Sequence, residues 1–248
     1  MFGFKKKQQP FPEEWKQIIT QHVPYFRRLP ADKQTALQKR TQRFLREKNF
    51  EGCGGLSLTD EMKVTIATQA CILILGSEDE MYPSLRSVLI YPEEYFANSR
   101  QTSRGGIITE GIQHRAGESW SYGDVVLAWN DVKAGADNDR DGRNLVFHEF
   151  AHQLDREFGA TLRLEEQPHD DDNAWTRILR KTYRAFLNDV NHGRPTLIDT
   201  YGATNPAEFF AVTTECFFEK PLKLRKKHPE LYEQFHIFYQ QNPADYFE

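Results

Sequence analysis

Residues 144–155, NLVFHEFAHQLD, contain two histidines four positions apart, with a glutamate directly after the first. On an α-helix, residues i and i+4 lie on the same face, one turn apart. The imidazoles of His148 and His152 could therefore bind one tetrahedral zinc ion, with bonds of about 2.0–2.1 Å. Glu149 lies about 100° further round the helix, where it could take a proton from a water activated by the ion. The spacing predicts a zinc-binding helix with its own general base.

The same stretch also fits an ordinary amphipathic helix. Apolar side chains occupy one face, and Gly159 is a suitable residue to end the helix. Such a short motif also arises by chance. Asp155 favours the metal site, because it lies on the face of His152 and could accept the second ring N–H of a ligating histidine. From the residues alone, a metal-free helix stays open as an alternative.

Bulk composition limits the class of protein. The chain has 248 residues, which corresponds to one large domain or two modest ones. A hydrophobic share of 39% is enough for a packed core. The net charge of −4 argues against direct binding of nucleic acid, which usually requires a basic excess. No Pro-, Gly- or Ser-rich linker forces a division, so we expect a single compact domain over residues 1–248.

Cysteine usage and hydropathy favour a soluble protein in a reducing compartment. The cysteines Cys53, Cys71 and Cys216 are widely spaced and form no CxxC pair, which argues against a disulfide framework. The N-terminal lysine run has no apolar stretch behind it, unlike a signal peptide. The longest apolar run, residues 70–76, is too short to span a bilayer. We therefore expect a cytoplasmic protein without a membrane partner.

Hydrophobic periodicity predicts an α+β fold, with a mainly helical region 1–80 and a sheet plus the zinc-site helices in 81–248. N-terminal helices are predicted at 12–23, 31–48 and 60–75. Segments rich in β-branched and aromatic residues predict strands at 87–92, 105–112 and 124–132. Helices return at 143–158, 173–190, 206–218 and 229–241. This order is typical of a small mixed sheet packed on helices.

Two segments have more than one interpretation. Residues 124–132 could be an edge strand that aligns an extended substrate, or a strand in the interior of the sheet. Residues 136–144, ADNDRDGRN, place Asp137, Asp139 and Asp141 at EF-hand offsets, but the last ligand position is His148 instead of glutamate. An acidic loop that caps the positive end of the following helix is the favoured interpretation.

A catalytic zinc site needs a third protein ligand. Residues 200–219, TYGATNPAEFFAVTTECFFE, offer the best candidate, Glu208. Asn205 and Pro206 suit the N-cap and the first position of a helix, so Glu208 could also be the glutamate at the third helical position of a capping box. Glu215, two turns later, could be a group that supports the ligands, a solvated charge, or the third ligand itself.

The combination of HEFAHQLD and YGATNPAEFF resembles the Mlc titration factor A family of bacterial zinc metallopeptidases, over essentially the whole chain. It also resembles the catalytic domain of anthrax lethal factor, which places a tyrosine seven residues before a glutamate ligand. The resemblance implies a zincin-like core with His148, His152 and Glu208 as ligands of one zinc ion. It further implies Glu149 as general base and Tyr201 as a phenol near the oxyanion.

The sequence departs from many glutamate-ligand zinc peptidases at one position. These enzymes place an acidic residue four positions after the third ligand, where this chain has Val212. Asp155, alone or with Glu215, would then be the group that supports the ligands.

The resemblance also implies partners. Peptides would be the substrates of an aminopeptidase-like activity, and the repressor Mlc would be a protein partner through which the chain affects sugar-transport (glucose PTS) gene expression. Repressor binding as the main task, with proteolysis secondary, is the alternative function.

Overall fold

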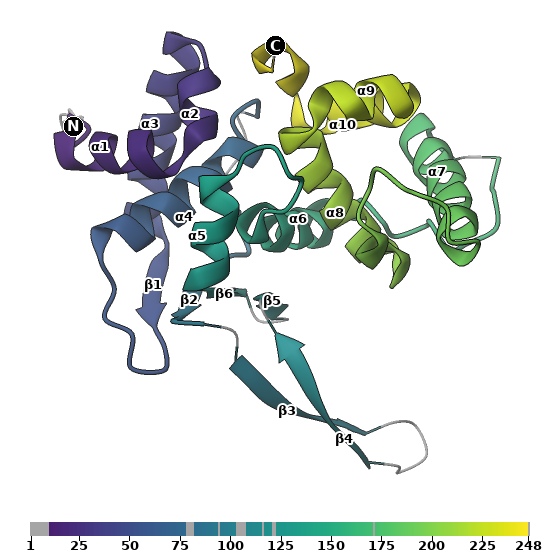
Figure 1. Ribbon diagram of the computed structural model, residues 1–248, viewed down its shortest axis with the longest axis horizontal. Helices are drawn as coiled ribbons and strands as arrows, with labels where there is room; N and C mark the ends of the chain where they lie inside the picture. Colours follow the sequence, from purple (N-terminus) through teal and green to yellow (C-terminus); the bar gives the residue numbers. More distant parts are fainter. Residues whose placement is uncertain are drawn as a thin grey trace, which may run out of the picture.

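A computed structural model describes residues 10–77, 82–93, 95–102, 108–115, 117–120, 123–170 and 172–247, with the backbone alone for the strands between 94 and 122. Figure 1 shows the N-terminal helices at the left and the C-terminal helices at the right, with the main sheet below the helical layer. The predicted α+β class, with a small mixed sheet packed on helices, is confirmed.

The N-terminal region is mainly helical, as predicted, but residues 49–52 also form a strand of the main sheet, which was expected only after residue 80. Its helices are α1 (Glu13–His22), α2 (Pro24–Arg28), α3 (Ala31–Glu47) and α4 (Asp60–Leu73). The Thr59 side chain accepts a hydrogen bond from the Met62 N–H and so caps α4. Every residue of α4 from Val64 to Leu73 is buried. This helix is therefore a central layer against which other elements pack.

The main sheet has the strand order β1–β2–β6–β5. Its strands are β1 (Asn49–Gly52), β2 (Ser87–Tyr91), β5 (Gly117–Trp120) and β6 (Asp124–Ala128). β1, β2 and β6 run parallel, whereas β5 pairs antiparallel with β6. β3 (Tyr95–Thr102) and β4 (Ile108–Arg115) form a separate antiparallel hairpin that extends away from the helices (Figure 1). The predicted strand at 105–112 is β4 from residue 108 onward, and residues 105–107 lie outside the described part.

The strand predicted at 124–132 differs from the structure in two respects. β6 ends at Ala128, and Trp129 begins the helix α5 (Trp129–Asp137), because the continuous buried run gives way to a helical spacing of Val132 and Ala136. β6 also pairs on both sides, so the edge-strand interpretation is wrong. Among the described strands of this sheet, β5 forms the edge beside β6.

The C-terminal region contains the helices that carry the motif residues. They are α6 (Leu145–Phe158), α7 (Ala174–Asn191), η1 (Thr200–Ala203), α8 (Pro206–Glu219), α9 (Pro221–Lys227), α10 (Pro229–Tyr239) and η2 (Pro243–Tyr246). Proline at the first position of α8, α9 and α10 fixes where each begins. The four helices predicted here are confirmed. No helix in the described ranges is long and apolar enough to cross a membrane.

Burial of aromatic side chains holds α6 against α8. The rings of Phe147 on α6 and Phe218 on α8 lie 5.4 Å apart, and both are almost fully buried. All of α8 from Phe209 to Glu219 is buried. Figure 1 shows α6 and α8 side by side at the centre of the molecule. This packing brings one face of α6 opposite the beginning of α8.

Candidate metal centre

Helix α6 has well-defined ends that fix its histidines in place. The Asn144 side chain accepts a hydrogen bond from the Phe147 N–H at 3.0 Å, which caps the first turn. Gly159 ends the helix in the left-handed conformation, at φ +65°, which glycine adopts without steric cost. His148 and His152 lie between these caps, with ring centroids 4.8 Å apart.

The structure brings the three predicted ligands together. His148 Nε2 lies 2.9 Å from Glu208 Oε2, and His152 Nε2 lies 3.3 Å from the same oxygen. The two Nε2 atoms are 3.2 Å apart. Ligand atoms bonded at 2.0–2.1 Å to one tetrahedral ion lie about 3.3 Å apart. The site therefore fits a metal ion, and it is the only such group of three among the described residues.

Glu208 occupies the third position of α8, as the motif predicts. The Asn205 side chain accepts from the Glu208 N–H at 2.9 Å and caps the helix. The Glu208 carboxylate lies against the histidine rings. Its burial raises its pKa, but hydrogen bonds from His148 and His152 outweigh this and lower the pKa to about 2. A carboxylate held ionised beside two imidazoles is suited to bind a cation.

The group that supports His148 is Glu215. Its Oε1 lies 2.8 Å from His148 Nδ1, and its Oε2 accepts from the Asn144 N–H at 2.6 Å. Burial lowers the pKa of His148, yet Glu208 and Glu215 raise it to about 10. With Nδ1–H donated to Glu215, the Nε2 atom is directed toward Glu208 and His152.

The expectation that Asp155 supports a ligating histidine is wrong. Both of its carboxylate oxygens are directed to Thr161, where they accept from the backbone N–H at 2.8 Å and from the hydroxyl at 2.7 Å. Asp155 is one turn before the end of α6, so its side chain is in reach of the chain that folds back after Gly159. It therefore stabilises the turn that follows the helix.

Glu149 lies beside the three-residue cluster, buried at 3% exposure. Burial raises its pKa to about 7, although the neighbouring His148 and His152 lower it. Its Oε2 has no hydrogen-bond partner in the described structure. A buried carboxylate oxygen without a partner is costly unless a ligand or water uses it. This is the position expected of a group that takes a proton from a reacting molecule.

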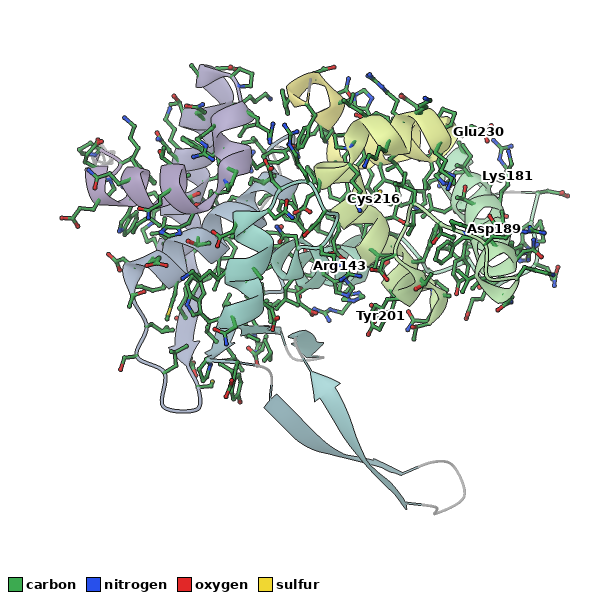
Figure 2. The ribbon with its side chains drawn as sticks, viewed as in Figure 1. Arg143, Lys181, Asp189, Tyr201, Cys216 and Glu230 are labelled. Atoms are coloured by element: carbon green, nitrogen blue, oxygen red, sulfur yellow. The ribbon has the colours of Figure 1, made fainter. Side chains whose placement is uncertain are left out.

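Tyr201 reaches the site from η1, the short helix before α8. Asp199 accepts from the Tyr201 N–H at 2.9 Å and caps this turn. The ring lies 6.0 Å from that of His148 and is 56% exposed, at the edge of the helical region in Figure 2. Burial and the carboxylates of Glu208 and Glu149 raise the pKa of Tyr201, so its hydroxyl stays a donor.

Val212, the departure from related zinc peptidases, has a packing role. It is buried at 4% exposure. A Cβ at Gly202 would lie 2.7 Å from its Cγ2 atom, so glycine lets η1 approach α8 closely. Val212 therefore positions the turn that carries Tyr201.

The acidic loop before α6 does not form a calcium site. Asp139 makes two hydrogen bonds to Arg28, at 2.5 and 3.0 Å, and Asp141 accepts from the Arg143 N–H at 2.9 Å. The loop acids do not cap α6, in contrast to the favoured interpretation. The N–H groups before the helix are bound by Glu215 and by Glu219, which sequence reasoning missed. Glu215 and Glu219 lie one turn apart in an otherwise apolar helix, and this pattern is the sequence signal that could have identified Glu219.

The chain matches a known protein family over most of its length. The family described as glucose-regulated metallo-peptidase M90 matches residues 4–240. The chain belongs to the M90 metallopeptidase family. This confirms the resemblance to the Mlc titration factor A family, which implied Glu208 as the third ligand.

Relatives of this M90 chain cover nearly its full length. The Synechocystis sp. protein slr2042, uncharacterised, is 38% identical over 94% of this chain and 85% of its own length. Proteins named Mlc titration factor A from Serratia proteamaculans and Klebsiella pneumoniae are 30% and 31% identical. These alignments cover 96% and 92% of this chain, and 92% and 86% of the relatives. The cluster of His148, His152 and Glu208 thus lies inside the region, residues 4–240, that matches the M90 family.

Proposed function

We propose that the chain is a zinc-dependent peptidase in which His148, His152 and Glu208 hold one zinc ion. The observation that carries this proposal is the separation of the three ligand atoms, between 2.9 and 3.3 Å. Two imidazole nitrogens and one carboxylate are the donors of many catalytic zinc sites in peptidases. The M90 family supports metal-dependent peptide hydrolysis as the reaction.

The residues around the ligands suit hydrolysis of a peptide bond. Bound zinc would supply a Lewis acid that polarises a carbonyl and lowers the pKa of water. Glu149 would take the proton of the attacking water and return it to the leaving amine. Its pKa of about 7 suits transfer in both directions near neutral pH. The Tyr201 hydroxyl would donate a hydrogen bond to the carbonyl oxygen as negative charge develops there.

Glu149→Gln tests this function. We expect the variant to retain stoichiometric zinc but to lose peptide hydrolysis by about 100-fold or more, because it removes the general base and leaves the ligands intact. Elemental analysis measures the zinc, and release of an amine from peptide substrates measures turnover. Hydrolysis at the wild-type rate would exclude Glu149 as the base.

An aminopeptidase-like preference is the finer proposal. This preference is what the resemblance to the Mlc titration factor A family implies, and relatives of that name match nearly the whole chain. The test compares the hydrolysis rates of one peptide with a free N-terminus and of the same peptide with an acetylated N-terminus. The free peptide is expected to react faster, and equal rates would indicate an endopeptidase.

Binding of an Mlc-type repressor is a second candidate function. It is favoured by the name of the relatives, Mlc titration factor A, at 30–31% identity. The Glu149→Gln variant separates the two functions, because it removes hydrolysis and leaves the molecular surface almost unchanged. Binding by this variant as tight as by the wild type would show that repressor capture does not require catalysis.

A further inference from the structure

A second carboxylate, Glu219, lies behind Glu215 at the beginning of the metal-site helix. Glu219 is one turn after Glu215 on α8 and is 2% exposed. Its Oε2 accepts from the N–H groups of Gly142 and Arg143, at 2.9 and 3.1 Å. Its Oε1 accepts from Asn144 Nδ2 at 3.1 Å. Two glutamates of α8 therefore bind three successive backbone N–H groups, those of residues 142, 143 and 144.

Asn144 connects this cluster to the metal-site helix. Its Nδ2 also donates to Gln69 Oε1 of α4 at 2.7 Å, while its Oδ1 caps α6. Its own N–H is bound by the same Glu215 carboxylate that meets His148 Nδ1. Asn144 is 5% exposed and Gln69 is 1% exposed, so water does not compete for these bonds. The chain of contacts runs from Glu219 through Asn144 and Glu215 to His148.

Each of these hydrogen bonds to Glu219 comes from a donor, although burial and the nearby carboxylates of Glu215 and Asp141 raise its pKa. A carboxylate accepts at both oxygens, whereas an amide would turn an N–H₂ group toward another donor. The turn also favours glycine at position 142, because its φ of +74° is a backbone conformation that other residues rarely adopt. The segment ADNDRDGRN, singled out for its EF-hand offsets, thus presents backbone N–H groups to the carboxylates of α8.

We infer that Glu219 is a positioning residue for the metal centre: by fixing residues 142–144 against α8, it holds Glu215 on His148 Nδ1 and so sets how tightly the site binds its metal. This inference rests on the proposed zinc site. Partners behind metal ligands typically change metal affinity by about 10–100-fold when they are removed. Because Glu219 acts through Asn144 and Glu215, we expect an effect near the lower end of that range.

Glu219→Gln is the test variant, and its zinc affinity is measured by competition with a chelator. We expect zinc to bind about 10-fold more weakly than in the wild type, with an altered absorption spectrum of the cobalt-substituted protein. Glu157→Gln is the matched control. Glu157 lies at the other end of α6 and likewise accepts from a backbone N–H, that of Ser84 at 3.1 Å. Its loss should lower stability without changing zinc affinity or the cobalt spectrum.

Asn144→Ser provides a second variant in case Glu219→Gln does not fold. Serine caps a helix about as well as asparagine, but it cannot donate to Glu219. A weakened zinc affinity in this variant supports the inference. Wild-type affinity and an unchanged cobalt spectrum in either folded variant would overturn it. A wild-type protein that binds no zinc would instead overturn the proposed function itself.

Discussion

At the scale of single residues, sequence spacing identified the two histidines of the cluster but not its carboxylate. His148 and His152 follow from the geometry of one helical turn. Glu208, 60 residues later, depended on family resemblance, because spacing cannot show which distant carboxylate will meet a helix. Asp155 was assigned wrongly, since its position on the correct face does not reveal that Thr161 folds back to it. Glu215 fills the place expected of Asp155.

Two variants test whether Glu215, and not Asp155, supports the ligating histidine. Glu215→Gln removes the carboxylate beside His148 Nδ1, so we expect zinc affinity to fall by about 10–100-fold. Asp155→Asn should keep the zinc affinity of the wild type. It should instead cost about 1–3 kcal/mol of unfolding free energy, because it places an amide among the donors of Thr161. Chelator competition and urea denaturation measure the two effects. Weaker zinc binding in Asp155→Asn alone would reverse the assignment.

At the scale of elements, the helices were predictable because their caps and apolar periods are local features. The end of β6 was not, because the apolar run 125–129 continues past Ala128 while the backbone changes from strand to helix at Trp129. The strand order could not be predicted either, because strand pairing joins segments that are far apart in the sequence. In the structure β6 lies between β2 and β5, inside the sheet. The close approach of η1 to α8 depends on Gly202 and also had no sequence signal.

Gly202→Ala tests whether this approach positions Tyr201. The added methyl group would meet Val212 Cγ2 at 2.7 Å and Phe209 Cα at 3.1 Å, so η1 must move away from α8. We expect kcat to fall by about 10-fold or more, since a small misplacement of a catalytic group is costly. Zinc content should not change, because the atoms nearest to the added methyl group belong to Val212, Phe209 and Phe186 and not to a proposed ligand. Unaltered turnover would show that the position of η1 does not matter for catalysis.

At the scale of the whole molecule, composition indicated a packed core but not which elements that core joins. Buried hydrophobic side chains form a continuous cluster from Ile19 in α1 to Phe247 at the C-terminal end. A single domain over residues 1–248, as predicted, should unfold in one cooperative transition. Trp15 in α1 and Trp175 in α7 report on the N-terminal helices and the C-terminal helices, respectively.

Thermal or urea unfolding followed by tryptophan fluorescence and by far-ultraviolet circular dichroism tests this organisation. Coincident transitions are expected, because a shared core makes the N-terminal helices and the metal-site helices unfold together. A variant with only Trp15 and another with only Trp175 report on each end separately. Two separated midpoints would indicate two independent units.

The central claim, one metal ion held by His148, His152 and Glu208, is tested most directly by X-ray anomalous scattering at the zinc edge from crystals of the purified protein. We predict a single strong peak at about 2.0–2.1 Å from both imidazole Nε2 atoms and from a Glu208 oxygen. A zinc-saturated crystal with no peak between these three side chains, or with the peak elsewhere, would contradict the account.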